Sequence, residues 1–343
     1  MKTEATYRAV KMDSSSSLKE FCLDRKKYHR RYVLNERVEE GINKAATIGR
    51  IVETLLLEPE EFDSRFYLSV CSKAPTSLML DFVNALSKHT IESTDADTGT
   101  VTRTFEQIAQ DAYVDSGFKI KFEAVLTKFI GSDAEIYYKE MREVQAKGLT
   151  VVTTEDIANA DRTVNELKTN FVTKEAVNLV NSSRYTVLNQ FQVEGYSVDG
   201  HLFKSMMDKI VIDHNERTIQ VYDLKCVWAV ENFYEEYYLY RRSYIQALLY
   251  YKAAISLTLQ DEYHGYRVEH PKFIVCDSTN YFNPLIYTMT DVDMMDAYNG
   301  FEHKGRVYPG VNSLIQNLEW AIANDTWNIS KENYINNGVV NIR

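Results

Sequence analysis

Two apolar runs near the middle of the chain are separated by a short polar segment. Residues 202–213 and 218–225 have the composition of β-strands, and residues 214–217 have that of a hairpin turn. Counting inward from the centre of that turn pairs Asp213 with Thr218 and then Asp208 with Asp223. Lys225 lies two residues beyond Asp223, so strand alternation places both on one face.

Helical periodicity dominates the chain on both sides of this hairpin. Before it, a helix capped at Ser17 runs through Tyr32, and a second helix spans 45–57. The segment 60–185 is mostly helical, with a loop at 95–102 and a short extended piece at 151–152. After it, a tyrosine-rich helix spans 232–257 and another spans 311–323, with helical residues from 291 onward. Further strands are expected at 188–193, 273–276 and 285–289.

This order predicts an α/β fold: a central mixed β-sheet with an antiparallel hairpin, flanked by helices and preceded by additional N-terminal helices. Residues 1–13 carry no anchoring pattern, so we expect a flexible N-terminus. Residues 14–343 are expected to form a single domain, with a helical part at 14–185, a catalytic core at 186–290 and a C-terminal helical part at 291–343.

Composition fits an ordinary soluble globular protein, with 45% hydrophobic and 26% charged residues. No apolar run is long enough for a membrane span, and the N-terminus has no signal-peptide pattern, so we expect an intracellular, cytoplasmic protein with no membrane partner. The net charge of −10 argues against a nucleic-acid coat but allows a local basic track, of which 25–31 is the main candidate. A solvated helix face explains that block equally well.

The four cysteines do not form a close pair, which disfavours a zinc site or an iron–sulfur cluster and favours free thiols.

Asp208, Asp223 and Lys225 form the strongest chemical constellation. Carboxylates held opposite each other repel unless a cation lies between them, and hard oxygen ligands suit Mg²⁺. The Leu224 carbonyl is a further candidate ligand, and the Lys225 ammonium would position water or stabilise developing charge. An exposed hairpin with a cross-strand salt bridge is the alternative interpretation.

Three other sets of residues are weaker candidates. Glu53 is a carboxylate on an apolar helix, which a surface glutamate would also explain. Gln246 and Tyr250 share a helical face, as contacts to a DNA phosphate or as an ordinary half-buried face. Arg241 and Arg242 are candidates for anchoring a terminal phosphate.

These motifs resemble the PD-(D/E)xK nuclease superfamily. Asp208 and the sequence Asp223-Leu224-Lys225 match its catalytic core, and Gln246-x-x-x-Tyr250 matches the QxxxY element of its RecB-like and RecE-like exonuclease branch. The resemblance covers about residues 15–330 in order, including segments at 17–18, 49–62 and 147–156, and Glu194 through Lys204 to Asp208. Two departures stand out: Glu53 replaces the metal-binding histidine of many relatives, and Met207 replaces the usual proline.

The resemblance implies a restriction-endonuclease-like core and a phage-type exonuclease that uses two Mg²⁺ or Mn²⁺ ions. Asp208, Asp223 and Glu53 would bind metal with the Leu224 carbonyl, and Lys225 would be the catalytic lysine. DNA contacts would come from a larger set: Gln246, Tyr250, Arg241, Arg242, Lys204 and Glu194. No iron–sulfur cluster is expected, because the three C-terminal cysteines of cluster-bearing relatives are missing.

The leading hypothesis is therefore a Mg²⁺-dependent DNA exonuclease of phage or prophage recombination. It would act in the bacterial host cytoplasm on the ends of linear duplex, as a ring-shaped homo-oligomer, and pass single strands to an annealing protein. An endonuclease on the same fold, or a non-catalytic DNA-end-binding protein, are the alternatives.

Overall fold

The computed structural model describes residues 3–36, 43–95, 97–145 and 147–340. Its internal contacts group into two compact units, which are Met1–Val38 with Leu167–Arg343, and Glu39–Glu166. We call these unit 1 and unit 2. The expected single domain stays a prediction, because compactness alone does not show whether a unit folds independently. None of the described helices is long and apolar enough to cross a membrane.

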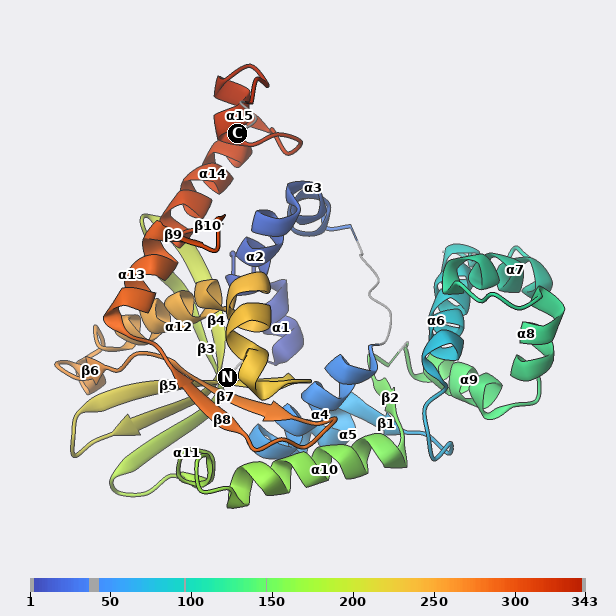
Figure 1. Ribbon diagram of the computed structural model, residues 1–343, viewed down its shortest axis with the longest axis horizontal. Helices are drawn as coiled ribbons and strands as arrows, with labels where there is room; N and C mark the ends of the chain where they lie inside the picture. Colours follow the sequence, from blue (N-terminus) through green and yellow to red (C-terminus); the bar gives the residue numbers. More distant parts are fainter. Residues whose placement is uncertain (1–2, 37–42, 96, 146, 341–343) are drawn as a thin grey trace. The chain divides into compact units, whose positions relative to one another are not determined.

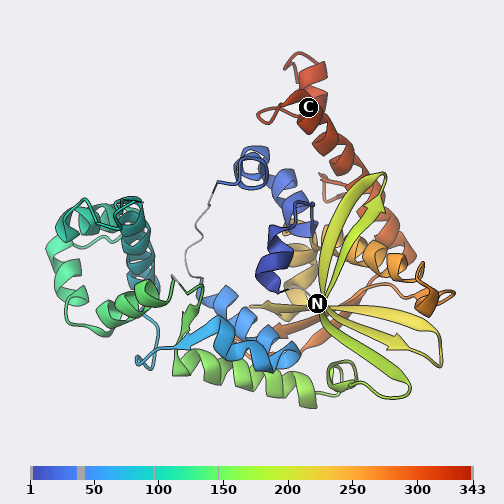
Figure 2. The same ribbon diagram turned by 180° about the vertical axis from the view of Figure 1, so that it is seen from behind.

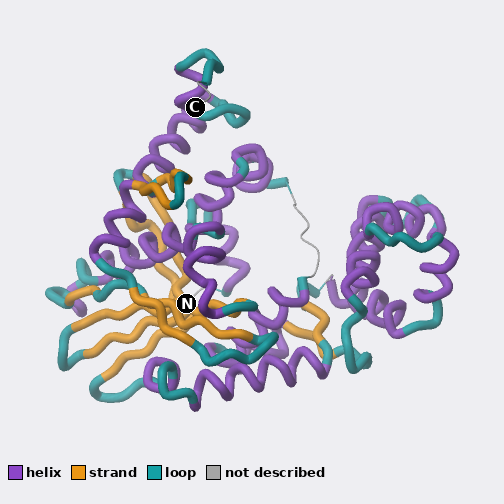
Figure 3. Tube along the Cα trace, viewed as in Figure 1, coloured by secondary structure: helices purple, strands orange, loops and turns teal. Residues whose placement is uncertain are grey.

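Unit 1 is built on a six-stranded mixed sheet in the order β3-β4-β5-β7-β8, with β6 also paired to β5 (Figures 1 and 3). β3 to β4, β4 to β5 and β7 to β8 are antiparallel, whereas β5 to β6 and β5 to β7 are parallel. The strands span Tyr185–Val198 (β3), His201–Asp213 (β4), Thr218–Val227 (β5), Arg267–Val268 (β6), Lys272–Asp277 (β7) and Leu285–Thr288 (β8). The predicted mixed α/β fold with an antiparallel hairpin is confirmed.

The predicted hairpin register is also confirmed as far as the ladder extends. Asp213 pairs with Thr218 and Lys209 pairs with Tyr222, around a turn at residues 214–217. The Asp213 carboxylate stabilises this turn, because Oδ1 accepts hydrogen bonds from the backbone N–H groups of Asn215 and Glu216 at 3.0 and 3.1 Å. This side-chain-to-backbone pattern is the reason Asp favours such turns.

Helices pack against the sheet and enclose an apolar core. α12 (Ser243–Leu257) crosses β3, β4 and β5, and α2 (Ser15–Leu23) packs against α12 (Figure 1). Leu18 and Phe21 of α2 and Ala247 of α12 are buried in one core with residues of these strands. The remaining helices of unit 1 are α1 (Glu4–Ala9), α3 (Arg25–Tyr28), α11 (Lys174–Asn178), α13 (Asp291–Asn299), α14 (Val311–Asn324) and α15 (Lys331–Ile335).

The tyrosine-rich helix predicted over 232–257 is confirmed over α12 (Ser243–Leu257), but it is not continuous. A 3-10 turn at Val230–Asn232 and a π-helix at Tyr234–Tyr240 precede α12, and Arg242 adopts a left-handed conformation with φ of +56°. A left-handed residue interrupts the hydrogen-bond ladder of a right-handed helix, so α12 starts afresh at Ser243.

The first helix and the C-terminal region also differ from expectation. α2 is capped by Ser14, with Ser17 completing the capping box, and Asp24 ends it and caps α3, which leads into a π-helix at His29–Val33. A short hairpin of β9 (Gly300–His303) and β10 (Arg306–Pro309), not predicted, separates α13 from α14. The tip of the β3–β4 hairpin lies beside α13 and α14, since Tyr298 donates to Asp199 at 2.8 Å and His201 contacts Glu319 (Figure 2).

The described part of the N-terminus is anchored, contrary to the expected flexible segment at 1–13. Lys204 Nζ donates hydrogen bonds to the carbonyls of Tyr7, Arg8 and Val10 at 2.9, 3.1 and 2.6 Å. Asp13 accepts hydrogen bonds from His201 and from two hydroxyls of α2 and α3. His201 and Lys204 lie almost 200 residues from this segment, which explains why no local pattern revealed their contacts.

Unit 2 is mainly helical (Figure 3). Its helices are α4 (Lys44–Leu57), a 3-10 turn (Pro59–Glu61), α5 (Phe62–Arg65), α6 (Ser77–Glu92), α7 (Phe105–Ser116), α8 (Phe122–Phe129), α9 (Asp133–Gln145) and most of α10 (Thr154–Thr169). A parallel pair, β1 (Phe66–Leu68) and β2 (Thr150–Val152), brings together the segments before α6 and after α9. The predicted helix at 45–57 and the extended piece at 151–152 are confirmed, and so is the loop at 95–102 apart from residue 96, which lies outside the described residues.

Candidate active site

The sheet of unit 1 divides at the position of the two aspartates. The β4–β5 ladder ends at Lys209 and Tyr222, after which β5 continues alongside β7. On the other side of β4, the β3 ladder skips Gln190, which would face Asp208 and has a left-handed φ of +47°. Asp208 and Asp223 are the next residues of the two diverging strands. Strands that separate leave backbone groups and side chains available for contacts other than the ladder.

We call the place where β4 and β5 separate, at Asp208 and Asp223, the fork. A hydrogen bond from β5 holds the Asp208 side chain there. Its Oδ2 accepts from the Leu224 backbone N–H at 2.8 Å, and the residue is only 9% exposed. A carboxylate that accepts a backbone N–H is held in one orientation as an anion. Asp208 thus faces the segment Asp223–Lys225, as the sequence predicted.

Asp223 is almost completely buried at 2% exposed and has a different neighbour at each carboxylate oxygen. Oδ1 accepts a hydrogen bond from Gln246 Nε2 at 2.7 Å. Oδ2 accepts no hydrogen bond of suitable geometry and instead forms an ion pair with the ammonium of Lys225. Lys225 Nζ also lies 3.5 Å from the Leu224 carbonyl oxygen, so one cationic group touches both oxygens.

Gln246 and Tyr250 lie one turn apart on α12 and contact each other, as their spacing predicted. Gln246 Nε2 donates to Tyr250 Oη at 2.9 Å, and Tyr250 Oη donates to the Met206 carbonyl at 2.7 Å. Burial, reinforced by the charges of Asp208 and Asp223, raises the pKa of the Tyr250 phenol well above its usual value. Tyr250 therefore stays protonated and remains a donor to β4.

Lys19 of α2 is a site residue that the sequence analysis missed. Its Nζ donates to Gln246 Oε1 at 2.9 Å, although the two residues are 227 positions apart. Burial and the nearby ammonium of Lys225 lower the pKa of Lys19 to about 8, against the opposite effect of Asp223 and Asp208. A lysine on the inner side of an amphipathic helix was the available signal, because lysine is rarely buried without a partner.

The donor set at the fork fits a hard divalent cation. Two aspartates and the Leu224 carbonyl supply oxygen ligands, and Mg²⁺ characteristically binds through one or two carboxylates and keeps several waters. The Asp223 Oδ2 atom, buried and without a hydrogen bond, already pairs with a cationic group. Among the described residues, however, no three His, Cys, Asp or Glu side chains gather into one metal cage.

Glu53, the predicted third carboxylate, lies on α4 of unit 2. Since the two units are described separately, its role as a metal ligand stays a prediction. α4 buries Ile48, Ile51 and Val52, and Glu53 is partly exposed at the edge of that apolar face.

The predicted DNA contacts other than Gln246 and Tyr250 fall into two groups. Glu194 and Lys204 lie opposite each other in the β3–β4 ladder, but Lys204 is only 7% exposed and its ammonium binds the N-terminal carbonyls. The buried Lys204 ammonium therefore anchors the N-terminal segment, which corrects its assignment as a DNA contact.

Arg241 and Arg242 occupy the break before α12 and have contrasting environments. Arg241 is exposed, with its guanidinium 4.6 Å from the centre of the Tyr237 ring. Arg242 is 8% exposed and donates to the Tyr240 carbonyl at 3.2 Å. Of the two, Arg241 has the accessibility that a phosphate contact requires.

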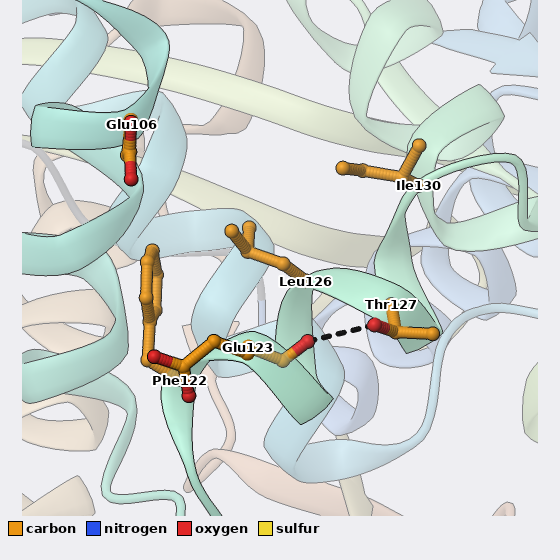
Figure 4. Close-up of a pocket in the computed structure, with 6 residues that line it drawn as sticks. All are labelled: Glu106, Phe122, Glu123, Leu126, Thr127 and Ile130. Carbon is orange, nitrogen blue, oxygen red and sulfur yellow. Dashed lines mark hydrogen bonds between the residues drawn. The ribbon is translucent and has the colours of Figure 1, made fainter.

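Unit 2 carries a shallow pocket between α7 and α8, where Figure 4 shows the apolar side chains of Phe122, Leu126 and Ile130 with Glu106 and Glu123. Thr127 Oγ1 donates to the Glu123 carbonyl at 2.8 Å. The described lining holds no basic side chain that could activate the Thr127 hydroxyl, so the fork in unit 1 remains the candidate site.

Comparisons with known proteins add little to this geometry. No protein-family model and no curated protein matches the chain. A solved structure from Eubacterium rectale, named "Putative exonuclease", aligns over 100% of this chain and 95% of its own, with 12% identity and a TM-score of 0.48. At that level of similarity the assignment of function depends on the residues of the site itself.

Proposed function

We propose that this chain is a Mg²⁺-dependent deoxyribonuclease that hydrolyses phosphodiester bonds from the ends of DNA. The observation that carries the proposal is the fork itself, where Asp208, Asp223 and Lys225 meet on diverging strands and Gln246 fixes one aspartate oxygen. Two buried carboxylates beside an ammonium, with the Gln246 amide orienting one of them, form an arrangement suited to metal-assisted hydrolysis.

Each residue has a definable task in this reaction. A divalent ion bound here would polarise the phosphate of the substrate and lower the pKa of a bound water. The carboxylate oxygens of Asp208 and Asp223 would hold this ion. The Leu224 N–H orients Asp208, and Gln246 orients Asp223. Lys225, whose side chain is 21% exposed, can reach the attacking water or the developing negative charge on phosphorus.

The proposal extends to the features that the family resemblance implies. These are two Mg²⁺ or Mn²⁺ ions with Glu53 as an added ligand, a ring-shaped homo-oligomer acting on duplex ends, and a phage or prophage recombination role beside a single-strand annealing protein. The bacterial host cytoplasm would be its compartment. Each extends beyond the geometry of unit 1 and is proposed on the resemblance alone.

A comparison of linear and closed circular DNA, each incubated with Mg²⁺ or with EDTA, tests the proposal. Loss of the linear substrate only, in Mg²⁺ only, is the expected result. Cleavage of the closed circle would instead indicate an endonuclease on the same fold. Binding to ends without cleavage of either substrate would indicate a non-catalytic end-binding protein and overturn the proposal.

A further inference from the structure

Lys19 is the one candidate-site residue contributed by α2, and its contact determines which way the Gln246 amide faces. A lysine ammonium carries three donors and no acceptor, so the Gln246 atom 2.9 Å from Lys19 Nζ must be the carbonyl oxygen. The amide nitrogen then has to face the opposite side. There it donates to Asp223 Oδ1 and Tyr250 Oη, at 2.7 and 2.9 Å.

The contact with Lys19 fixes the direction of the hydrogen bonds that follow, from Gln246 to Tyr250 and from Tyr250 to Met206. Tyr250 accepts from Gln246 and donates its own proton to the Met206 carbonyl at 2.7 Å, so both protons of the amide and the proton of the phenol have partners. A flipped amide would place an oxygen against the Asp223 carboxylate and leave Tyr250 without its donor. Gln246 and Tyr250 are 9% and 5% exposed, so water is a poor substitute.

We infer that Lys19 is a positioning residue that sets the orientation of Gln246, and through it directs Asp223 Oδ2 toward a bound divalent cation. The inference rests on the proposed function, since it assigns a task at the same site. Lys19 acts through the amide and not on the substrate. Groups that orient a metal-binding carboxylate in this way typically change metal affinity tenfold to a hundredfold when they are removed.

Electrostatics alone predicts the opposite effect, which makes the inference testable by sign. The Lys19 ammonium repels a divalent cation bound at the fork. If Lys19 contributes charge only, Lys19→Met should therefore strengthen metal binding. If Lys19 instead orients Gln246, the same variant should weaken metal binding. The Gln246→Leu background separates the two effects, because there is no amide left to orient.

The experiment is a double-mutant cycle with the full chain, in which Mn²⁺ binding is measured by titration calorimetry without DNA. We expect Lys19→Met and Gln246→Leu each to weaken Mn²⁺ binding about tenfold, and the double variant to bind no more weakly than Gln246→Leu alone. Lys174→Met, at an exposed position of α11, is the matched control and should leave affinity unchanged.

Three results would overturn the inference: unchanged or tighter binding by Lys19→Met, additive losses in the double variant, or no Mn²⁺ binding by the unaltered protein. If Lys19→Met does not fold by circular dichroism, Lys19→Ala, which also lacks a donor, replaces it in the same cycle with the same criteria. A protein that binds Mn²⁺ but cleaves no DNA refutes the proposed nuclease only. The cycle then still decides the role of Lys19.

Discussion

Asp223 has the most constrained side chain of the candidate site. It is 2% exposed, with Gln246 at one oxygen and Lys225 at the other. A buried carboxylate is stable only when its charge is compensated, so these two contacts are needed even before any cation binds. A substitution at Asp223 can therefore test its role in cleavage without unfolding the protein only if the new side chain has the same shape.

Asp223→Asn preserves that shape and removes the negative charge. We expect it to reduce DNA cleavage by roughly 1000-fold or more, because it removes a metal ligand, and we expect Lys225→Ala to have an effect of similar size. Cleavage of a labelled linear duplex in Mg²⁺ gives the rates, with circular dichroism as the check on folding. Asp261→Asn, an exposed carboxylate in a 3-10 turn, should behave as the unaltered protein. Near-normal cleavage by either site variant would refute the assignment.

Glu53 presents the same question on the other unit of the chain. If it is a metal ligand, Glu53→Ala should raise the Mg²⁺ concentration for half-maximal cleavage by about tenfold. Glu60→Ala, a nearby exposed glutamate, is the matched control. A Mg²⁺ titration that coincides with that of the unaltered protein would make Glu53 an ordinary surface residue.

At the scale of elements, the hairpin was predictable and its surroundings were not. The turn at 214–217 and the alternation on both sides fix the register from local sequence, and the observed ladder agrees up to Lys209 and Tyr222. The break at Arg242 was hidden because a left-handed arginine has no compositional signature, unlike glycine. Contacts such as that of Lys19 with Gln246 depend on chain topology, which residue spacing does not encode.

The attachment of α1 to β4 is a second long-range contact, and Lys204 carries it. Lys204→Met should lower the free energy of unfolding by about 1–3 kcal/mol and expose residues 3–13 to proteolysis, since three carbonyls lose their donor. Limited proteolysis with mass spectrometry, together with urea unfolding, measures both. Lys11→Met, an exposed lysine on the same segment, is the control. Equal digestion of both variants would show that Lys204 is not the anchor.

His201 joins the same N-terminal segment to β4 in a pH-dependent manner. Its hydrogen bond to Asp13 at 2.9 Å, helped by Glu319, raises the pKa of His201 against the effect of burial. Burial alone would raise the pKa of Asp13, but hydrogen bonds from His201, Ser17 and Tyr28 outweigh it and lower that pKa.

The signs of these two shifts define a pH window. A raised histidine pKa contributes stability that is fully present below about pH 6.5, its unfolded value, and is lost as pH rises through the folded pKa. The lowered Asp13 pKa contributes stability above about pH 4 that is lost as pH falls. We expect the urea midpoint to decrease above pH 6.5, and His201→Gln to remove most of that decrease. A variant with the same pH slope as the unaltered protein would exclude this pair as the cause.

At the scale of the whole molecule, the distribution of charge decides how an acidic protein could bind DNA. The net charge is −10, yet five basic residues fall within positions 25–31 on α3 and the π-helix that follows it. Lys27 and Arg31 are engaged with Glu20, whereas Lys26 and Arg30 are exposed and line a surface pocket with Trp327. Within this segment, Lys26 and Arg30 are the exposed basic side chains and the candidates for phosphate contacts.

Salt dependence tests whether this basic segment contacts DNA. Each neutralised duplex phosphate steepens the plot of log affinity against log salt by roughly 0.9, so the double substitution Lys26→Ala with Arg30→Ala should reduce the slope by about 1.8. Fluorescence anisotropy with a labelled linear duplex in Ca²⁺, over a series of KCl concentrations, gives the slope without cleavage. The control, Lys168→Ala with Lys174→Ala, changes the net charge equally at exposed positions of unit 1. If both double variants shift the slope equally, net charge and not the α3 segment governs binding, and the basic block is a solvated helix face.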